Sequence, residues 1–178
     1  MVTWLNLGEI LRVNARKYRK KLAVKDSKRQ MSFYEYNTRA NRLANGLLGM
    51  GLGKGDRIAV ISCNCIEFME VYAAAAKSGI VVVPINWRLP PKDMEYIINN
   101  SDAKGVIVAK EFVGNVESIR ANLKKVAPKN YIIIGEEKHE GYMNFEDVVS
   151  SGTDTEPNVK VEGKDTWILL YTSGTTGT

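Results

Sequence analysis

The distribution of apolar residues along the chain predicts a buried sheet in its middle and later parts. Four short runs are continuously apolar and rich in Val and Ile, a pattern typical of strands that are buried on both faces. These runs are residues 57–61, 80–85, 105–108 and 131–134. Between them lie longer stretches whose apolar positions follow helical spacing. Strands that alternate with helices predict a mostly parallel α/β sheet.

The helices expected between these strands carry recognisable start and stop signals. They cover residues 65–77, 92–100 and about 116–125. Asn64 is the candidate N-cap of the first helix, and Gly79 is its expected stop. Pro91 lies at the start of the second helix, where proline is tolerated. After the fourth strand, residues 144–149 are expected to form one helical turn or two.

The part before the first buried strand predicts two more helices. Residues 5–21 have helical spacing, and residues 22–24 are a short strand candidate. Ser32 and Glu35 form a capping box that opens the second helix. The 178 residues suit one domain. We therefore expect an α/β fold with a mostly parallel, doubly wound sheet and helices on both faces.

The last residues of the chain have the composition of a phosphate-binding loop. A polar loop over residues 150–164 leads to an expected strand at Asp165–Tyr171. The residues that follow are Thr172, Ser173, Gly174, Thr175, Thr176, Gly177 and Thr178. Glycines let several backbone N–H groups point at one anion, and hydroxyl groups add rotatable donors. The run lacks the Gly-Lys-Ser/Thr ending of a Walker A loop. On composition alone, a flexible tail is an equally good interpretation.

Composition and charge are those of an ordinary globular chain with a mildly basic balance. Hydrophobic residues make up 44% of the chain and charged residues 25%, with a net charge of +5. The basic residues are scattered except for one cluster at residues 16–21. We interpret that cluster as the solvated C-terminal end of a helix, which favours cations. Tyr18 is the single aromatic residue of this cluster, which is not the repeated interleaving of a nucleic-acid site, so we expect no nucleic-acid partner.

Few residues are available for metal or redox chemistry. Cys63, Cys65 and a distant His139 cannot supply the four ligands of a zinc site, and two cysteines do not indicate a disulfide framework. We assign no catalytic residue and no metal ligand. The N-terminus lacks the pattern of a signal peptide. The longest apolar stretch, residues 71–85, is interrupted and too short for a membrane span. We expect a cytoplasmic protein without an integral membrane segment.

Five segments, taken in order, resemble the adenylate-forming superfamily, and in particular its acyl-CoA synthetases. They are residues 31–36, 53–60, 73–86, 87–104 and the terminal run 171–178. The terminal run is similar to the family's phosphate-loop signature at all eight positions. In the family the run continues Pro-Lys-Gly, so this chain ends inside the loop. The resemblance implies that residues 1–178 are the N-terminal portion of the AMP-binding domain, without the C-terminal domain.

The resemblance also implies an activity. A carboxylate, expected to be a fatty or aromatic acid, attacks the α-phosphate of ATP to give an acyl-adenylate and pyrophosphate. Coenzyme A then takes the acyl group and AMP leaves. Thr172–Thr178 would bind the β- and γ-phosphates of ATP, with Mg²⁺ sharing the charge. The fragment itself is expected to be inactive.

Two other functions fit the same residues. The chain is also consistent with an adenylation domain that loads a carrier protein, or with a non-catalytic α/β assembly domain. The stretch Asn86–Leu89 favours an acyl-CoA synthetase. The resemblance also implies that later segments of the family extend or cover this part of the sheet. Sheet edges and apolar helix faces that are left uncovered predict self-association, so a homo-oligomer is possible.

Overall fold

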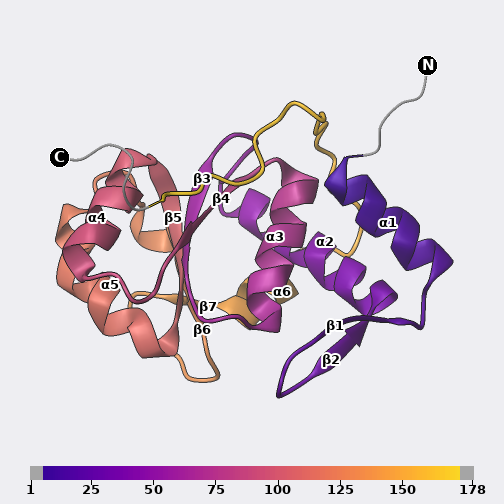
Figure 1. Cartoon of the computed structure of the whole chain (residues 1–178), viewed down its shortest axis with the longest axis horizontal. Coiled ribbons are helices and arrows are strands. Elements are labelled where there is room, and N and C mark those ends of the chain that lie inside the picture. Colours follow the sequence, from indigo (N-terminus) through magenta and orange to yellow (C-terminus); the bar gives the residue numbers. More distant parts are fainter. Residues whose placement is uncertain (1–5, 173–178) are drawn as a thin grey trace.

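The computed structural model describes residues 6–172 of the chain. Its helices and strands alternate as the sequence pattern predicts (Figure 1). The helices are α1 (Leu7–Lys17), α2 (Phe33–Gly49), α3 (Ile66–Ser78), α4 (Pro91–Asn100), α5 (Val113–Ile119) and α6 (Phe145–Ser151). The strands are β1 (Leu22–Lys25), β2 (Gln30–Ser32), β3 (Arg57–Ile61), β4 (Val81–Ile85), β5 (Ala103–Ala109), β6 (Tyr131–Ile134) and β7 (Met143–Asn144). Short 3-10 turns are η1 (Lys110–Phe112), η2 (Arg120–Asn122) and η3 (Pro128–Asn130).

Five strands form one parallel sheet in the order β4-β3-β5-β6-β7. The chain first adds β4 on one side of β3. It then returns to the other side of β3 with β5 and continues outward on that side with β6 and β7. The strand order therefore reverses between β3 and β5, which is the switch point of a doubly wound fold. Helices cover both faces of the sheet (Figure 1). The predicted fold class is confirmed.

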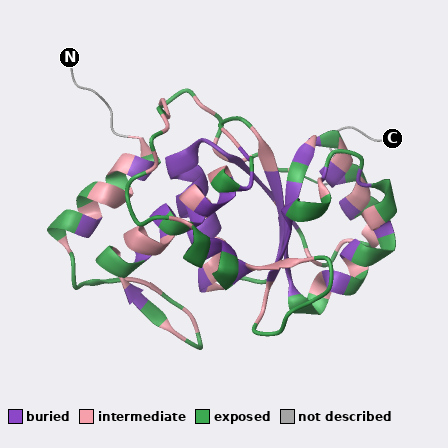
Figure 2. Cartoon of the chain, turned by 180° about the vertical axis from the view of Figure 1, so that it is seen from behind, coloured by how far each residue is buried: buried purple, intermediate pink, exposed green. Residues whose placement is uncertain are grey.

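Alternate residues of each central strand enter two separate cores. On β3, Ile58 and Val60 pack with α2, α3 and α6, whereas Ala59 and Ile61 pack with α4 and α5. This is the two-residue period of a strand that is buried on both sides. Figure 2 shows the result as a continuous buried layer through the middle of the molecule.

The N-terminal part forms a smaller, more exposed unit on α2 and α3. The strands β1 and β2 form an antiparallel hairpin, and α1 packs against both helices. A third core joins these parts through Met31, Tyr36 and Ala40, with Leu11 and Val24 packed against them. In Figure 1 the hairpin projects from the body of the molecule below α1.

Two of the predicted helix boundaries are confirmed, and a third is wrong. Ser32 and Glu35 form the expected capping box of α2. Gly79 ends α3 at φ 73°, and a Cβ there would lie 2.7 Å from Cγ of Lys54, so only glycine fits this turn without strain. Asn64 does not cap α3. Cys65 takes the N-cap position and makes no side-chain cap bond.

The remaining differences lie at short or frayed elements. The N-terminal helix ends at Lys17 rather than at residue 21, because Tyr18 leaves helical geometry. The helix expected near 116–125 is α5 plus the turn η2, which together cover 113–122. The short strands β2 and β7 were not predicted, since two or three residues carry no periodic signal. Among the described residues, no helix is long and apolar enough to cross a membrane.

Candidate functional site

The residues that lead to the predicted phosphate loop lie beside the outer edge of β4. We refer to residues 165–172 as the C-terminal segment. Its Trp167 carbonyl accepts a hydrogen bond from the Val82 N–H at 3.0 Å, and its Leu169 N–H donates to the Val82 carbonyl at 2.9 Å. These bonds form a single parallel bridge between Val82 and Ile168. The strand predicted at Asp165–Tyr171 is therefore wrong in extent, because only one bridge forms.

Pro84 explains why the pairing stops after one bridge. Along β4, the N–H groups of alternate residues point toward the same neighbouring strand. Val82 bonds outward to the C-terminal segment, so residue 84 would be the next outward donor. Pro84 has no N–H and cannot extend the ladder.

The loop before the C-terminal segment is held in place by α2 and α3. Asn41 Nδ2 donates to the Asp154 carbonyl at 2.8 Å, and Asn45 Nδ2 donates to the Thr153 carbonyl at 2.9 Å. Lys77, whose side chain is only 2% exposed, pairs with Glu156 at 2.7 Å. Burial lowers the pKa of Lys77, and the Glu156 carboxylate opposes that shift. The long polar loop is thus bonded through its backbone at several points.

Trp167 is the main side-chain anchor of the C-terminal segment. Its indole Nε1 donates to the Tyr72 carbonyl at 2.9 Å, and its ring meets the Tyr72 ring edge-on with centroids 5.6 Å apart. Tyr72 in turn stacks on Phe68 at 5.0 Å. Asp165 forms a second anchor through a 2.6 Å ion pair with Lys54. The segment is therefore fixed at its start.

The segment turns away from the sheet before the predicted loop. Leu170 is 67% exposed, and Tyr171 OH donates to Asn100 Oδ1 at 2.6 Å. Asn100 ends α4 and precedes β5, so Tyr171 lies at the amino ends of the strands. Thr172 is exposed. The other six predicted phosphate-binding residues, Ser173, Gly174, Thr175, Thr176, Gly177 and Thr178, lie outside the described residues.

A cavity of about 350 Å³ lies between the C-terminal segment and the sheet edge, but its cations are already paired. Lys54 bonds to Asp165. Arg57 donates to the Ser101 carbonyl at 2.7 Å and lies 3.4 Å from the Asp102 carboxylate. Groups that are satisfied in this way gain little from an added anion. The described residues that line this cavity therefore offer no unpaired cation for a phosphate group.

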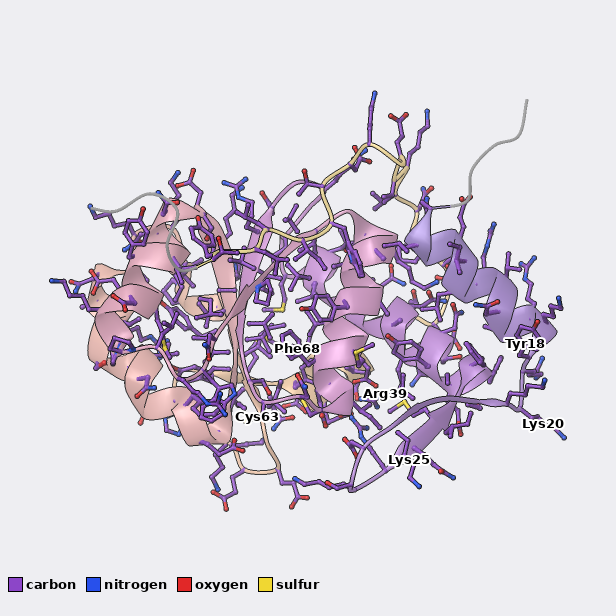
Figure 3. All side chains as sticks on the ribbon, viewed as in Figure 1. Tyr18, Lys20, Lys25, Arg39, Cys63 and Phe68 are labelled. Atoms are coloured by element: carbon purple, nitrogen blue, oxygen red, sulfur yellow. The ribbon has the colours of Figure 1, made fainter. Side chains whose placement is uncertain are left out.

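The opposite, carboxyl edge of the sheet is where open α/β sheets bind ligands, at the switch point. Cys63, labelled in Figure 3, follows β3 there. Its side chain is exposed. Cys65 is half-buried, and burial raises the pKa of its thiol, so the reactive thiolate is disfavoured. Within residues 6–172, no three His, Cys, Asp or Glu side chains are grouped to hold a metal ion.

An aromatic stack also lies at this edge, and sequence reasoning missed it. Trp87 follows β4 and stacks on Phe112, which follows β5, with ring centroids 5.4 Å apart. The Arg88 guanidinium lies 4.6 Å from the Trp87 ring centroid, over its face. Trp87 and Arg88 are adjacent in the chain, but Phe112 lies on another strand connection, so only the parallel sheet brings it to them. The stack carries one exposed cation, Arg88.

The most deeply buried charge in the described residues serves the fold. Glu70 on α3 is fully buried and pairs with Arg39 of α2, which also bonds to Glu146 of α6 at 2.7 Å. Figure 3 shows Arg39 in the space between these helices and the hairpin. Burial raises the pKa of Glu70, and the hydrogen bonds and charge of Arg39 oppose it. A shifted carboxyl can mark a functional site, but this network joins three helices away from any described cavity.

Comparison with known proteins identifies the family. The model of the AMP-binding enzyme family matches residues 11–178. A long-chain-fatty-acid–CoA ligase of Thermus thermophilus is 34% identical over 82% of this chain. A fatty acid–[acyl-carrier-protein] ligase, ScoC of Streptomyces coeruleorubidus, is 32% identical over 84% of it.

Solved structures give the same result. The anthranilate CoA ligase AuaEII in complex with anthranoyl-AMP superposes with a TM-score of 0.92 and 31% identity, over 99% of this chain and 34% of that one. The N-terminal domain of FACL13 from Mycobacterium tuberculosis gives a TM-score of 0.87 and 31% identity, over 98% of this chain and 42% of that one. The chain spans about a quarter of the two curated relatives, 26% and 27%. The chain belongs to the AMP-binding enzyme family.

Proposed function

We propose that this chain is the N-terminal part of the adenylating domain of a cytoplasmic, ATP-dependent acyl-CoA ligase. In the first step a carboxylate oxygen attacks the α-phosphorus of ATP, and pyrophosphate leaves as the acyl-adenylate forms. In the second step the thiol of coenzyme A attacks the acyl carbon, and AMP leaves. One observation carries the proposal: the family match runs through the terminal Gly-Ser-Thr run to residue 178.

The terminal run is suited to the first step. Backbone N–H groups at Gly174 and Gly177 and hydroxyl groups at Thr175 and Thr176 are donors for the phosphate oxygens of ATP. Donors that are held ready for the charge of departing pyrophosphate stabilise the transition state more than the ground state. Mg²⁺ would neutralise part of the phosphate charge. No group of described residues fits a magnesium site, so we assign none of them to it.

The choice of substrate and acceptor rests on the named relatives. The Thermus protein is a fatty-acid–CoA ligase, and AuaEII is an anthranilate CoA ligase, so we propose a fatty or aromatic carboxylic acid. Coenzyme A is the acceptor in both names. ScoC is named for transfer to an acyl-carrier protein, which keeps a carrier-loading enzyme as the second candidate. Self-association of the chain stays a prediction, supported by the exposure of Leu169 and Leu170.

The test compares two polypeptides in an ATP–pyrophosphate exchange assay with a panel of fatty and aromatic acids. The first is the 178-residue chain, and the second extends it to the length of its relatives. We expect exchange only from the longer polypeptide, and thioester formation with free coenzyme A rather than with carrier protein. No acid-dependent exchange from the longer polypeptide would overturn the proposal. Exchange from the 178-residue chain would overturn the expected inactivity of that portion.

A further inference from the structure

One end of the molecule carries a dense cluster of basic residues. Residues 16–29 contain eight Lys and Arg side chains and one carboxylate, whereas the whole chain has a net charge of +5. The rest of the molecule therefore has a small net negative charge. Seven of these eight cations are exposed, and we call them the basic end. They are Arg16, Lys17, Arg19, Lys20, Lys21, Lys25 and Lys28.

The end of a helix does not account for this cluster. The sequence interpretation assigned residues 16–21 to a helix C-terminus, but α1 ends at Lys17. Arg19, Lys20 and Lys21 lie in the connection to β1, and Lys25 and Lys28 lie in the hairpin. The helix dipole acts within the last turn, so it favours at most the first two cations of the basic end.

None of the seven cations has a carboxylate partner among the described residues. Asp26 is the only acid in this stretch, and it is turned inward. Its carboxylate accepts the backbone N–H groups of Lys28 and Arg29 at 2.8 Å and that of Ile66 at 3.2 Å. Arg29, the eighth cation, is partly buried and pairs with Glu67 at 2.7 Å. The basic end is therefore an uncompensated positive surface.

Apolar and aromatic side chains are mixed into the basic end. Leu22 is 54% exposed and Tyr34 is 45% exposed. The Arg19 guanidinium lies 4.2 Å from the centroid of the Tyr34 ring, and Lys17 and Lys21 lie 5.2 and 5.0 Å from that of Tyr18. Long basic side chains and aromatic rings combine an apolar body with a polar tip, which is the chemistry of a membrane interface.

The basic end has the form of a projection. Figure 3 shows Tyr18, Lys20 and Lys25 at the outer margin of the molecule, beyond α1 and along the hairpin, with their side chains directed away from the sheet. The cavity beside β4 is lined by other residues. A projecting surface of long, exposed cations suits an extended, fluid array of negative charge better than a ligand of fixed shape.

We propose that the basic end binds the anionic surface of a lipid bilayer, with the cations at the headgroups and Leu22 at the acyl boundary. The observations favour a bilayer over a nucleic acid, because the rings of Tyr18 and Tyr34 already carry the chain's own cations and the exposed apolar Leu22 lies among those cations. The proposal concerns a peripheral contact and does not depend on the proposed ligase activity.

The test is co-sedimentation of the 178-residue chain with vesicles. One set contains phosphatidylcholine alone, and the other contains phosphatidylserine at 30 mol%. We expect binding only to the anionic set at low salt, and its loss at about 0.5 M salt, because screening shortens the reach of each charge. A cation near an anionic bilayer is worth about fivefold in partitioning. Replacement of Lys17, Lys20, Lys21 and Lys25 by Gln should therefore lower partitioning by about a hundredfold or more.

A second four-lysine variant tests whether vesicle binding depends on where the lysines lie or only on the net charge of the chain. Lys92, Lys124, Lys129 and Lys138 are exposed and have no ion pair among the described residues. Their replacement by Gln removes the same charge and should leave vesicle binding within about twofold, since none lies in the basic end. All eight side chains are on the surface, and circular dichroism checks that both variants are folded. Leu22→Gln should lower partitioning about threefold to tenfold through its lost apolar contact.

Three results would overturn the proposal. The first is equal binding of the chain to neutral and anionic vesicles. The second is an equal loss in the two four-lysine variants, which would indicate net charge rather than a site. The third is tighter binding to duplex DNA or polyglutamate than to anionic vesicles at equal charge concentration. That last result would assign the basic end to an acidic macromolecule.

Discussion

β3 and the C-terminal segment are both short apolar stretches that run parallel to β4, one on each side of it, yet they form different structures. β3 makes a full parallel ladder with both β4 and β5, and Ile58–Ile61 are all buried. The C-terminal segment makes one bridge, and Leu170 is 67% exposed. The two stretches have similar compositions, so the difference arises from the strand edge that each one faces.

β3 meets two complete strand edges, whereas the C-terminal segment meets an edge that is interrupted by Pro84. The side of β4 that faces β3 offers every required N–H group, and the outer side offers only that of Val82 before the proline. Without a ladder, the segment is held by the side chains of Asp165, Trp167 and Tyr171. An apolar run is therefore a strand only where its neighbour can complete the hydrogen bonds.

The largest effect is expected in β3. Ile58→Ala should lower the free energy of unfolding by about 3 kcal/mol, because it removes fully buried atoms and leaves a cavity. Ile58 is 0% exposed, and its Cδ1 lies 3.3 Å from where a Cβ on Gly105 would be. Urea unfolding followed by circular dichroism measures the change. Ile10→Ala on α1, where the side chain is 41% exposed, is the control and should change stability by less than about 0.5 kcal/mol.

A smaller effect is expected at the anchor of the C-terminal segment. Trp167→Ala should cost about 2 kcal/mol in the same experiment, since a half-buried ring and one hydrogen bond are lost. Trp167→Phe keeps a ring against Tyr72 and should cost only about 1 kcal/mol for the missing indole N–H. If Trp167→Ala lowered the free energy of unfolding as much as Ile58→Ala, the C-terminal segment would be as integral to the fold as β3. That result would contradict the difference described between the two regions.

The smallest effect on stability is expected at the interruption itself. Pro84→Val supplies the missing N–H, which would donate to the Leu169 carbonyl and continue the ladder. The added bond is worth about 1 kcal/mol, and loss of the proline constraint on the unfolded chain offsets most of it. Hydrogen exchange is the sensitive measurement, and the amide of Tyr171 should become protected. Unchanged exchange at Tyr171 would mean that Pro84 is not what stops the pairing.

Much of the sheet could be predicted from the sequence because its strands are buried on both faces. Continuous runs such as Arg57–Ile61 and Tyr131–Ile134 have no other good explanation, and the capping box at Ser32 fixes the start of α2. Asn64 failed as a cap because the chain stays extended for one more residue, to Cys65. The two-residue strand β7 depends on its neighbour β6 and has no signal of its own.

The site was predictable only where it is local in sequence. The Gly-Ser-Thr run is contiguous, so its chemistry can be read from residues 172–178 directly. The stack of Trp87 on Phe112 joins two strand connections and requires the strand order to be known. The basic end combines α1, the following turn and the hairpin, and β2 within that hairpin was not predicted.

The most direct test of the account is the rate of ATP–pyrophosphate exchange in a polypeptide that extends this chain to the length of its relatives. The double variant Thr175→Ala, Thr176→Ala should lower the rate by about a hundredfold to a thousandfold, because donors to the departing pyrophosphate are lost. Thr166→Ala makes the same chemical change at an exposed position ahead of the run, and it should leave the rate within about twofold. Equal rates in the double variant and the unaltered polypeptide would contradict the assignment of residues 172–178 to phosphate binding.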